Sequence, residues 1–151
     1  MSDDLQDLYQ ELILDHNKNP RNRRRLDDAD RRVEGYNPLC GDRVTVFLKL
    51  DGNVVKEVTF EGSGCAISTA SASLMTEQLK GKTIDEAKDL FRRFHSLVTG
   101  EAKETDEGPG LGKLEVFSGV CRYPARVKCA TLVWHTMDAA LDQRREVVST
   151  E

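Results

Sequence analysis

The first periodic segment of the chain has the spacing of an amphipathic helix. Four aliphatic residues recur at positions i, i+3, i+7 and i+8, namely Leu5, Leu8, Leu12 and Ile13. This spacing places them on one face of a helix over residues 4–17. Pro20 follows shortly after, and because proline disfavours helical geometry in the residue before it, the helix is expected to end there.

Alternating apolar and polar positions come next, and they predict a β-hairpin. The alternation of Val44, Val46 and Leu48 with polar or outward positions predicts a strand over residues 43–50. An Asp-Gly-Asn turn follows, and the alternation resumes in a return strand over residues 54–61. A further edge strand is expected over residues 33–36.

Three helices are predicted in the second half of the chain, over residues 65–80, 83–97 and 124–145. The first has small side chains in its first half, so it can pack closely against a neighbouring element. Gly81 is suited to cap its C-terminus. Thr83 and Glu86 have capping-box spacing at the start of the second helix. Pro124 opens the third, where its missing N–H costs little.

The remaining segments predict loops around a single folded unit. Residues 99–112 are polar and rich in glycine and proline, a short element is expected over residues 113–117, and the chain from about residue 146 is a polar tail. Strands followed by helices are typical of α+β proteins. The sequence therefore predicts one domain over residues 1–151, in which a small antiparallel sheet, the hairpin plus an edge strand, packs against several helices.

Composition and charge narrow the class of function. The formal net charge is −4, which disfavours binding to nucleic acid. No apolar run approaches the ~20 residues of a membrane span, and the N-terminus lacks the basic and apolar regions of a signal peptide. These features predict a cytoplasmic protein. The arginine-rich segment 21–25 is either a solvated loop or a docking patch for an acidic partner.

Four cysteines carry the candidate chemistry: Cys40, Cys65, Cys121 and Cys129. Thiols stay reduced in the cytoplasm, so metal binding or thiol chemistry is favoured over disulfides. Cys40 and Asp42 precede the first hairpin strand, and Cys65 follows the second. Because a hairpin brings the start of one strand beside the end of the next, residues 40–42 and Cys65 are expected to lie close together.

The helices supply the rest of the predicted site. Cys65 lies at a helix N-terminus, where the helix dipole and free N–H groups stabilise a thiolate. Cys129 lies on the last helix beside Arg126 and Lys128, cations that also favour a thiolate. Three thiolates and the carboxylate of Asp42 would make a tetrahedral donor set that suits Zn²⁺. No pair of cysteines has the short spacing typical of zinc modules, and Cys121 is expected to be a bystander.

The blocks around these cysteines resemble a known family. They are residues 37–42 (NPLCGD), 62–73 (GSGCAISTASAS) and 123–132 (YPARVKCATL), together with the opening segment 14–22 (LDHNKNPRN). The resemblance, which covers nearly the whole chain, is to the U-type iron–sulfur assembly family of IscU, SufU and the NifU N-terminal domain. Lys128 stands where IscU-type scaffolds have histidine, and the interval between Cys65 and Cys129 is long, so the chain is most similar to the SufU branch.

Resemblance to the SufU branch implies a zinc-bound sulfurtransferase. The implied metal ligands are Cys40, Asp42, Cys65 and Cys129. The implied partner is a PLP-dependent cysteine desulfurase of the SufS type, whose persulfide sulfur would pass to Cys40 and then to downstream iron–sulfur assembly proteins. Arg126 would steady the anionic sulfur. In this role the chain is a sulfur acceptor that acts alongside an enzyme.

Two other interpretations use the same residues. The chain could be a scaffold that assembles a [2Fe–2S] cluster, with iron in place of zinc. Alternatively, it could be a structural zinc module that only binds partners, in which case Cys40→Ser would destabilise the fold without a specific kinetic defect. The metal retained on purification separates the first two interpretations, because labile iron and sulfide indicate a scaffold whereas chelation-resistant zinc indicates transfer.

Overall fold

A computed structural model describes residues 3–38, 41–99, 113–114, 116–117, 120, 123–142 and 148–149. The four helices are α1 (Asp3–Lys18), α2 (Ala66–Leu79), α3 (Ile84–Thr99) and α4 (Pro124–Leu141). The four strands are β1 (Arg31–Asn37), β2 (Asp42–Asp51), β3 (Val54–Ser63) and β4 (Val148–Ser149). The predicted α+β class is confirmed, and each helix predicted from periodicity is present.

The sheet has the strand order β3-β2-β1-β4. The first three strands are antiparallel, as the hairpin pattern predicts. The short strand β4 runs parallel to β1 and pairs Val148 with Gly35, so β1 is an inner strand at this point. The strand expected over residues 33–36 is therefore confirmed as part of β1, and β4 adds a pairing on its outer side at Gly35 and Tyr36. A two-residue strand has no periodicity of its own, and the sequence of the tail carried no signal for it.

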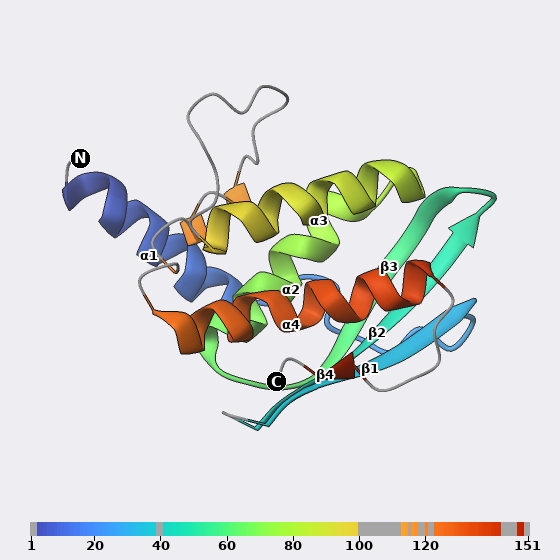
Figure 1. Ribbon diagram of the computed structural model, residues 1–151, viewed down its shortest axis with the longest axis horizontal. Coiled ribbons are helices and arrows are strands. Elements are labelled where there is room, and N and C mark those ends of the chain that lie inside the picture. The colour runs from blue at the N-terminus through green and yellow to red at the C-terminus, as the bar shows by residue number, and fades with distance from the viewer. Residues whose placement is uncertain are drawn as a thin grey trace.

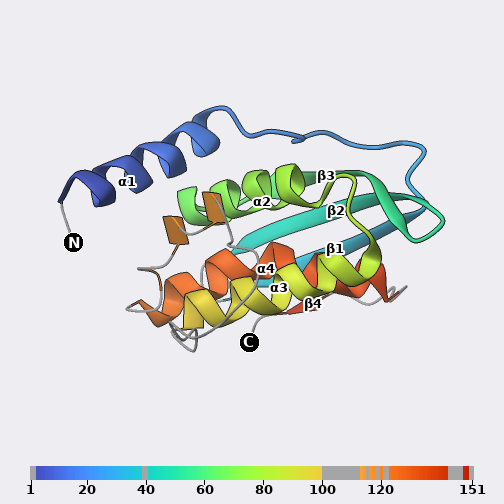
Figure 2. The same cartoon turned by 90° about the horizontal axis from the view of Figure 1, so that it is seen from above.

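The helices lie on one face of the sheet (Figures 1 and 2). Helices α2 and α4 contact the strands, α1 packs on the far side of α2, and α3 packs on α4. The core between them is apolar and centres on Trp134, whose ring stacks on Phe94 at a centroid distance of 4.6 Å. Within the described parts of the chain, no helix combines the length and apolar character needed to span a membrane.

Small side chains bring α2 and α4 close together, as their sequence predicts. Ser71 of α2 is fully buried, and its hydroxyl donates to the carbonyl of Ala130 at 2.6 Å. The same oxygen accepts the indole N–H of Trp134 at 3.1 Å. Both partners lie on α4, so one short polar side chain satisfies two buried groups and fixes the register of the two helices.

The ends of the helices follow the predicted signals with one exception. The capping box is present, because Thr83 and Glu86 each accept the other's backbone N–H at 3.1 Å. Gly81 follows α2 with φ +86°, a conformation that glycine adopts without strain. Helix α4 ends at Leu141, about one turn before the predicted end. Arg31 of β1 explains this end, since its guanidinium donates to the carbonyl of Leu141 at 2.7 Å.

The arginine-rich segment lies along the outer edge of β3. The carbonyl of Asn22 accepts the N–H of Phe60 at 3.1 Å, and Arg23 donates to the carbonyl of Gly62 at 2.8 Å. Arg24 forms an ion pair with Glu57 of β3. Covering an edge strand with charged side chains protects it from pairing with other chains. The segment is thus a loop, exposed at residues 23–25, that also engages its own sheet, and the docking patch stays a prediction.

Two predicted segments fall largely outside the described residues. The expected loop over residues 99–112 is one of them, apart from Thr99 at the end of α3. For the short element predicted over residues 113–117, the described pairs 113–114 and 116–117 have 3-10 helical backbone. Leu114 and Phe117 are fully buried there and join the core.

Candidate metal centre

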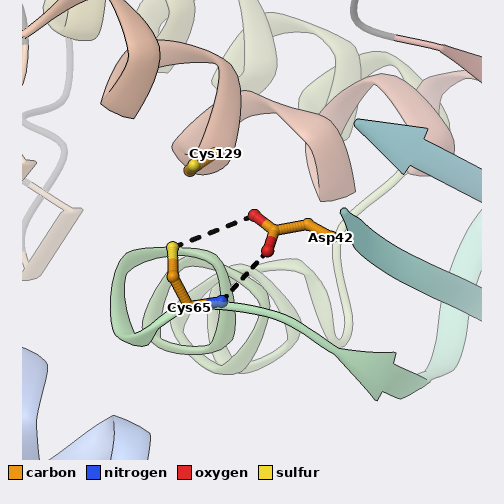
Figure 3. Close-up of side chains that lie close together, drawn as sticks. All are labelled: Asp42, Cys65 and Cys129. Carbon is orange, nitrogen blue, oxygen red and sulfur yellow. Dashed lines mark hydrogen bonds between the residues drawn. The ribbon is translucent and has the colours of Figure 1, made fainter. Parts of the chain in front are cut away.

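The hairpin brings Asp42 and Cys65 together, as the sequence predicts. Asp42 is the first residue of β2, and its neighbour Arg43 pairs with Ser63 at the end of β3. The carboxylate Oδ1 of Asp42 accepts the backbone N–H of Cys65 at 3.1 Å, and Oδ2 lies 3.8 Å from the Cys65 Sγ (Figure 3). Asp42 is buried and Cys65 is half-buried, so the pair lies at the edge of the core.

Cys65 is the N-cap residue of α2, which confirms its predicted place at a helix N-terminus. Its backbone is extended, with φ −71° and ψ 173°, and its Sγ accepts the N–H of Ser68 at 3.4 Å. A cap residue of this kind satisfies a backbone donor that the helix leaves unpaired. The dipole of α2 also favours negative charge at this sulfur.

Two glycines make the approach of β3 to this site possible. Gly62 has φ +142°, and a Cβ there would lie 2.1 Å from the carbonyl oxygen of Arg43. A Cβ on Gly64 would lie 2.9 Å from the Ser68 Oγ and 3.1 Å from the Asp42 Oδ1. Larger residues at either position would push the Cys65 segment away from Asp42.

Helix α4 contributes the third donor, Cys129. Its side chain is almost fully buried and turns toward the other two residues (Figure 3). One ligand atom from each of Asp42, Cys65 and Cys129 lies within 4.8 Å of the other two. Ligand atoms around a tetrahedral ion with bonds of about 2.3 Å are about 3.7 Å apart. A contraction of about 1 Å would therefore suffice, and two sulfurs with one carboxylate are donors that zinc accepts.

A buried amide lies beside these donors. Asn37, at the end of β1, is fully buried, and its Nδ2 lies 4.0 Å from the Cys129 Sγ. Asn37 opens the first cysteine block, residues 37–42, and the sequence pattern assigns it no role. Its place three residues before Cys40 was the available signal.

Arg126 and His135 are described by the structure, and neither belongs to this group. Cys40, the predicted acceptor and ligand, and Cys121, the predicted bystander, lie outside the described residues. Arg126 lies on the exposed face at the start of α4. The ring of His135 packs edge-on against that of Phe91 on α3 at a centroid distance of 5.0 Å, so it is engaged on the α3 side of α4.

Comparisons with known proteins agree with the sequence blocks. The family model for the NifU-like N terminal domain matches residues 8–130. The zinc-dependent sulfurtransferase SufU of Bacillus subtilis is 46% identical over 134 residues, which are 89% of each chain. The iron–sulfur cluster assembly scaffold protein IscU of Thermotoga maritima is 43% identical over 134 residues, covering 89% of this chain and 92% of the relative.

Solved structures show the same fold. The N-terminal part of a nitrogen-fixing NifU-like protein from Brucella abortus superposes with a TM-score of 0.79 at 27% sequence identity. The match covers 92% of this chain and 95% of that structure. The agreement therefore extends over the helices and the sheet together, including the elements that carry the three gathered donors.

Proposed function

The chain belongs to the family of NifU-like N-terminal domains, and from this premise we propose that it is a zinc-bound sulfurtransferase of iron–sulfur cluster assembly. It would accept persulfide sulfur from a cysteine desulfurase of the SufS type and pass it to downstream assembly proteins. The observation that carries the proposal is the convergence of two thiols and one carboxylate within 4.8 Å. The similarity to a zinc-dependent sulfurtransferase supports zinc as the metal.

The proposed zinc ligands are Cys40, Asp42, Cys65 and Cys129. Asp42 is suited to hold the Cys65 backbone and bind the metal at once. Its Oδ1 already accepts the Cys65 N–H, and its Oδ2 faces the Cys65 sulfur. Cys65 and Cys129 are fixed by helices at their backbones. Zinc, when bound, would keep the thiols ionised and protected from oxidation.

Cys40 is the proposed sulfur acceptor. It precedes Gly41, an exposed residue with φ +74°. The other two proposed cysteine ligands instead belong to regular structure, Cys129 to helix α4 and Cys65 to the cap of α2. The Cys40 thiolate would attack the outer sulfur of the desulfurase persulfide. A new S–S bond forms on Cys40, the S–S bond on the desulfurase breaks, and its electron pair leaves with the desulfurase thiolate. The exposed guanidinium of Arg126 is proposed to steady the anionic sulfur.

Alanine production by the cognate desulfurase tests the proposal. The zinc-loaded chain is expected to stimulate it in a saturable manner, and Cys40→Ala is expected to abolish the stimulation. Cys121→Ala is the matched control, because it removes a cysteine outside the proposed ligand set. Stimulation that survives in a folded, zinc-loaded Cys40→Ala variant would refute transfer through Cys40.

A scaffold function is the second candidate, favoured by the 43% identity to an IscU scaffold protein. A [2Fe–2S] cluster would then assemble on the same cysteines and Asp42. Purification without added metal separates the candidates. Zinc that resists mild chelation supports transfer, whereas labile iron together with acid-labile sulfide supports the scaffold.

A further inference from the structure

Asn37 is a polar side chain that the core encloses completely, at the point where β1 ends beside the candidate metal centre. A buried amide is costly unless its hydrogen-bonding groups are satisfied. The contacts of such a residue therefore indicate its role. The contacts of Asn37 lead to three separate parts of the candidate centre.

The backbone of Asn37 holds both ends of the segment that carries Cys40. Its Cα is the register partner of Asp42 in the ladder between β1 and β2. Its carbonyl also accepts the N–H of Gly41 at 2.8 Å. The residues that immediately precede and follow the Cys40 segment are thus tied to each other, and Asp42 starts its strand directly opposite Asn37.

The side chain of Asn37 reaches the donor on the opposite element. Its Nδ2 lies 4.0 Å from the Sγ of Cys129, which is the outer limit for a hydrogen bond to sulfur. A thiolate can only accept, so the amide must present its NH₂ group to an ionised Cys129. Hydrogen bonds to ionised acceptors are shorter and stronger than those to neutral ones. The contact is therefore expected to tighten when Cys129 binds a metal.

We propose that Asn37 is a positioning residue of the metal centre, which orients the Cys129 sulfur toward Asp42 and Cys65 by an N–H···S hydrogen bond. This inference rests on the metal binding proposed above. The amide holds the sulfur at one angle and offsets part of its negative charge. Hydrogen bonds of this kind to metal ligands are worth about 10–100-fold in metal affinity.

Cobalt and zinc binding to the full chain test the inference. Asn37→Asp has the shape of asparagine but turns a donor into an anion beside the thiolate, so zinc affinity is expected to fall about 100-fold. Asn37→Ala removes the donor without adding charge, and a fall of about 10-fold is expected. In both variants the sulfur-to-cobalt charge-transfer absorption is expected to shift, because it reports the environment of the thiolates.

The matched control is Asn22→Asp. Asn22 also donates from its amide to a neighbouring side chain, the Thr76 Oγ1 at 3.0 Å, but it lies beside α2 away from the three donors. Its φ of +59° is one that both asparagine and aspartate tolerate. The control is expected to keep the zinc affinity and the cobalt spectrum of the unmodified chain. Urea unfolding of the metal-free proteins shows whether each variant is folded.

A double-mutant cycle with Cys129→Ser shows whether Asn37 acts through that sulfur. In the Cys129→Ser background, Asn37→Ala is expected to cause no further loss of zinc affinity. An equal loss in both backgrounds would overturn the inference, as would an unchanged affinity and spectrum in folded Asn37 variants. If the unmodified chain binds cobalt without any thiolate absorption, the proposed metal site itself fails, and the inference falls with it.

Discussion

Two buried polar clusters in this molecule are built on opposite electrostatic principles. One lies between α1 and α2 and consists of His16, Arg21, Asn22, Ser73 and Thr76; it is called the anchor cluster below. The other is the candidate metal centre of Asp42, Cys65 and Cys129. Both are largely enclosed, and both join elements that are far apart in sequence.

Donors and acceptors alternate in the anchor cluster. The backbone N–H of Arg21 donates to the Ser73 Oγ at 2.8 Å, and that oxygen lies 2.6 Å from the Nδ1 of His16. Thr76 accepts from Asn22 and donates to the carbonyl of Ser73 at 2.8 Å. The Nε2 of His16 lies 3.4 Å from a Glu77 carboxylate oxygen, near enough to interact but outside hydrogen-bond geometry.

The candidate metal centre instead gathers three acids. Once its two thiols and its carboxylate are ionised, three anions this close repel one another unless a cation lies among them. The contrast separates a structural cluster from a functional one without reference to any relative. A polar cluster that pairs most of its donors with acceptors stabilises the fold by itself, whereas a cluster of convergent acids is suited to an external cation.

Cys65→Ser is expected to cause the largest loss of zinc affinity. If zinc affinity did not fall, the distinction between the anchor cluster and the candidate metal centre would not hold. Four ligands share a zinc binding free energy of about 10–16 kcal/mol, so losing one thiolate should lower zinc affinity by on the order of 10²–10³-fold. Serine is a strong N-cap, so the metal-free unfolding free energy should change by less than about 0.5 kcal/mol. Chelator competition and urea unfolding measure the two quantities.

Cys121→Ser is the control for this experiment, and it should retain full zinc affinity. Equal zinc affinity in Cys65→Ser and the unmodified chain would show that the convergent donors do not form the metal site. A large loss of metal-free stability in Cys65→Ser would instead place Cys65 in the structural class, with the anchor cluster.

His16→Ala should lower the stability of the metal-free protein without changing zinc affinity, which is the opposite of the result expected for Cys65→Ser. It removes a fully buried ring and leaves the Ser73 hydroxyl with one partner fewer, so the metal-free unfolding free energy should fall by about 2–4 kcal/mol. Zinc affinity of the folded protein should be unchanged. His95→Ala, at a half-buried position on α3, is the control and should cost less. A loss of zinc affinity in folded His16→Ala would remove the distinction between the clusters.

Substitutions of Asp42 should separate its contribution to metal binding from its hydrogen bond to the Cys65 N–H. Asp42→Asn keeps an oxygen that accepts the Cys65 N–H but is a poorer metal ligand, so zinc affinity should fall by roughly 10-fold with little change in metal-free stability. Asp42→Ala should lower affinity as well and also cost about 1 kcal/mol of stability, the typical value of a lost hydrogen bond. Equal metal-free stability in the two variants would show that the hydrogen bond from the Cys65 N–H to Asp42 does not stabilise the fold.

Local signals explain what could be predicted from the sequence. The proximity of Asp42 and Cys65 followed from the hairpin alone, and the place of Cys65 at a helix N-terminus followed from the helix predicted over residues 65–80. The reciprocal cap of Thr83 and Glu86 likewise depends on four consecutive residues. In each case the partners are joined by one turn or one tight connection, so spacing fixes their geometry.

Contacts between distant elements explain what could not be predicted. Arg31 ends α4 from a strand more than a hundred positions away, and nothing near Leu141 marks that end. His16 lies in the last turn of α1, and nothing in the local pattern shows that the packing of α2 buries its ring. This burial lowers the pKa of the imidazole. Burial of a polar residue depends on tertiary structure, which a single helix pattern does not contain.

The lowered pKa of His16 predicts a pH dependence in the anchor cluster. Burial lowers this pKa, the Arg21 guanidinium lowers it further, and the Glu77 carboxylate opposes them. The unfolded chain, with a histidine pKa of about 6.5, then binds the proton more readily than the folded one. Stability is therefore complete above about pH 6.5 and should decline below it, by at most about 1.4 kcal/mol per pH unit.

Urea unfolding of the metal-free protein between pH 5.5 and 7.5 (roughly the range in which histidines titrate) measures this slope. His16→Gln should flatten it. His135 also has a pKa lowered by burial, so His135→Gln should flatten it by a separate amount. An unchanged slope in folded His16→Gln would show that His16 is not the titrating group.

Thr59 belongs to neither cluster and gives the smallest expected effect. Its hydroxyl is fully buried on β3, across the ladder from Phe47, and has no hydrogen-bond partner among the described residues. Thr59→Val keeps the shape and removes the unsatisfied oxygen, so the unfolding free energy should rise by about 1 kcal/mol. Thr131→Val is the control, because that hydroxyl donates to the carbonyl of Val127 at 2.8 Å and its loss should not stabilise. If the unfolding free energy rises equally in both variants, the increase comes from added apolar surface. The presence or absence of a hydrogen-bond partner would then not determine what a buried hydroxyl contributes to stability here.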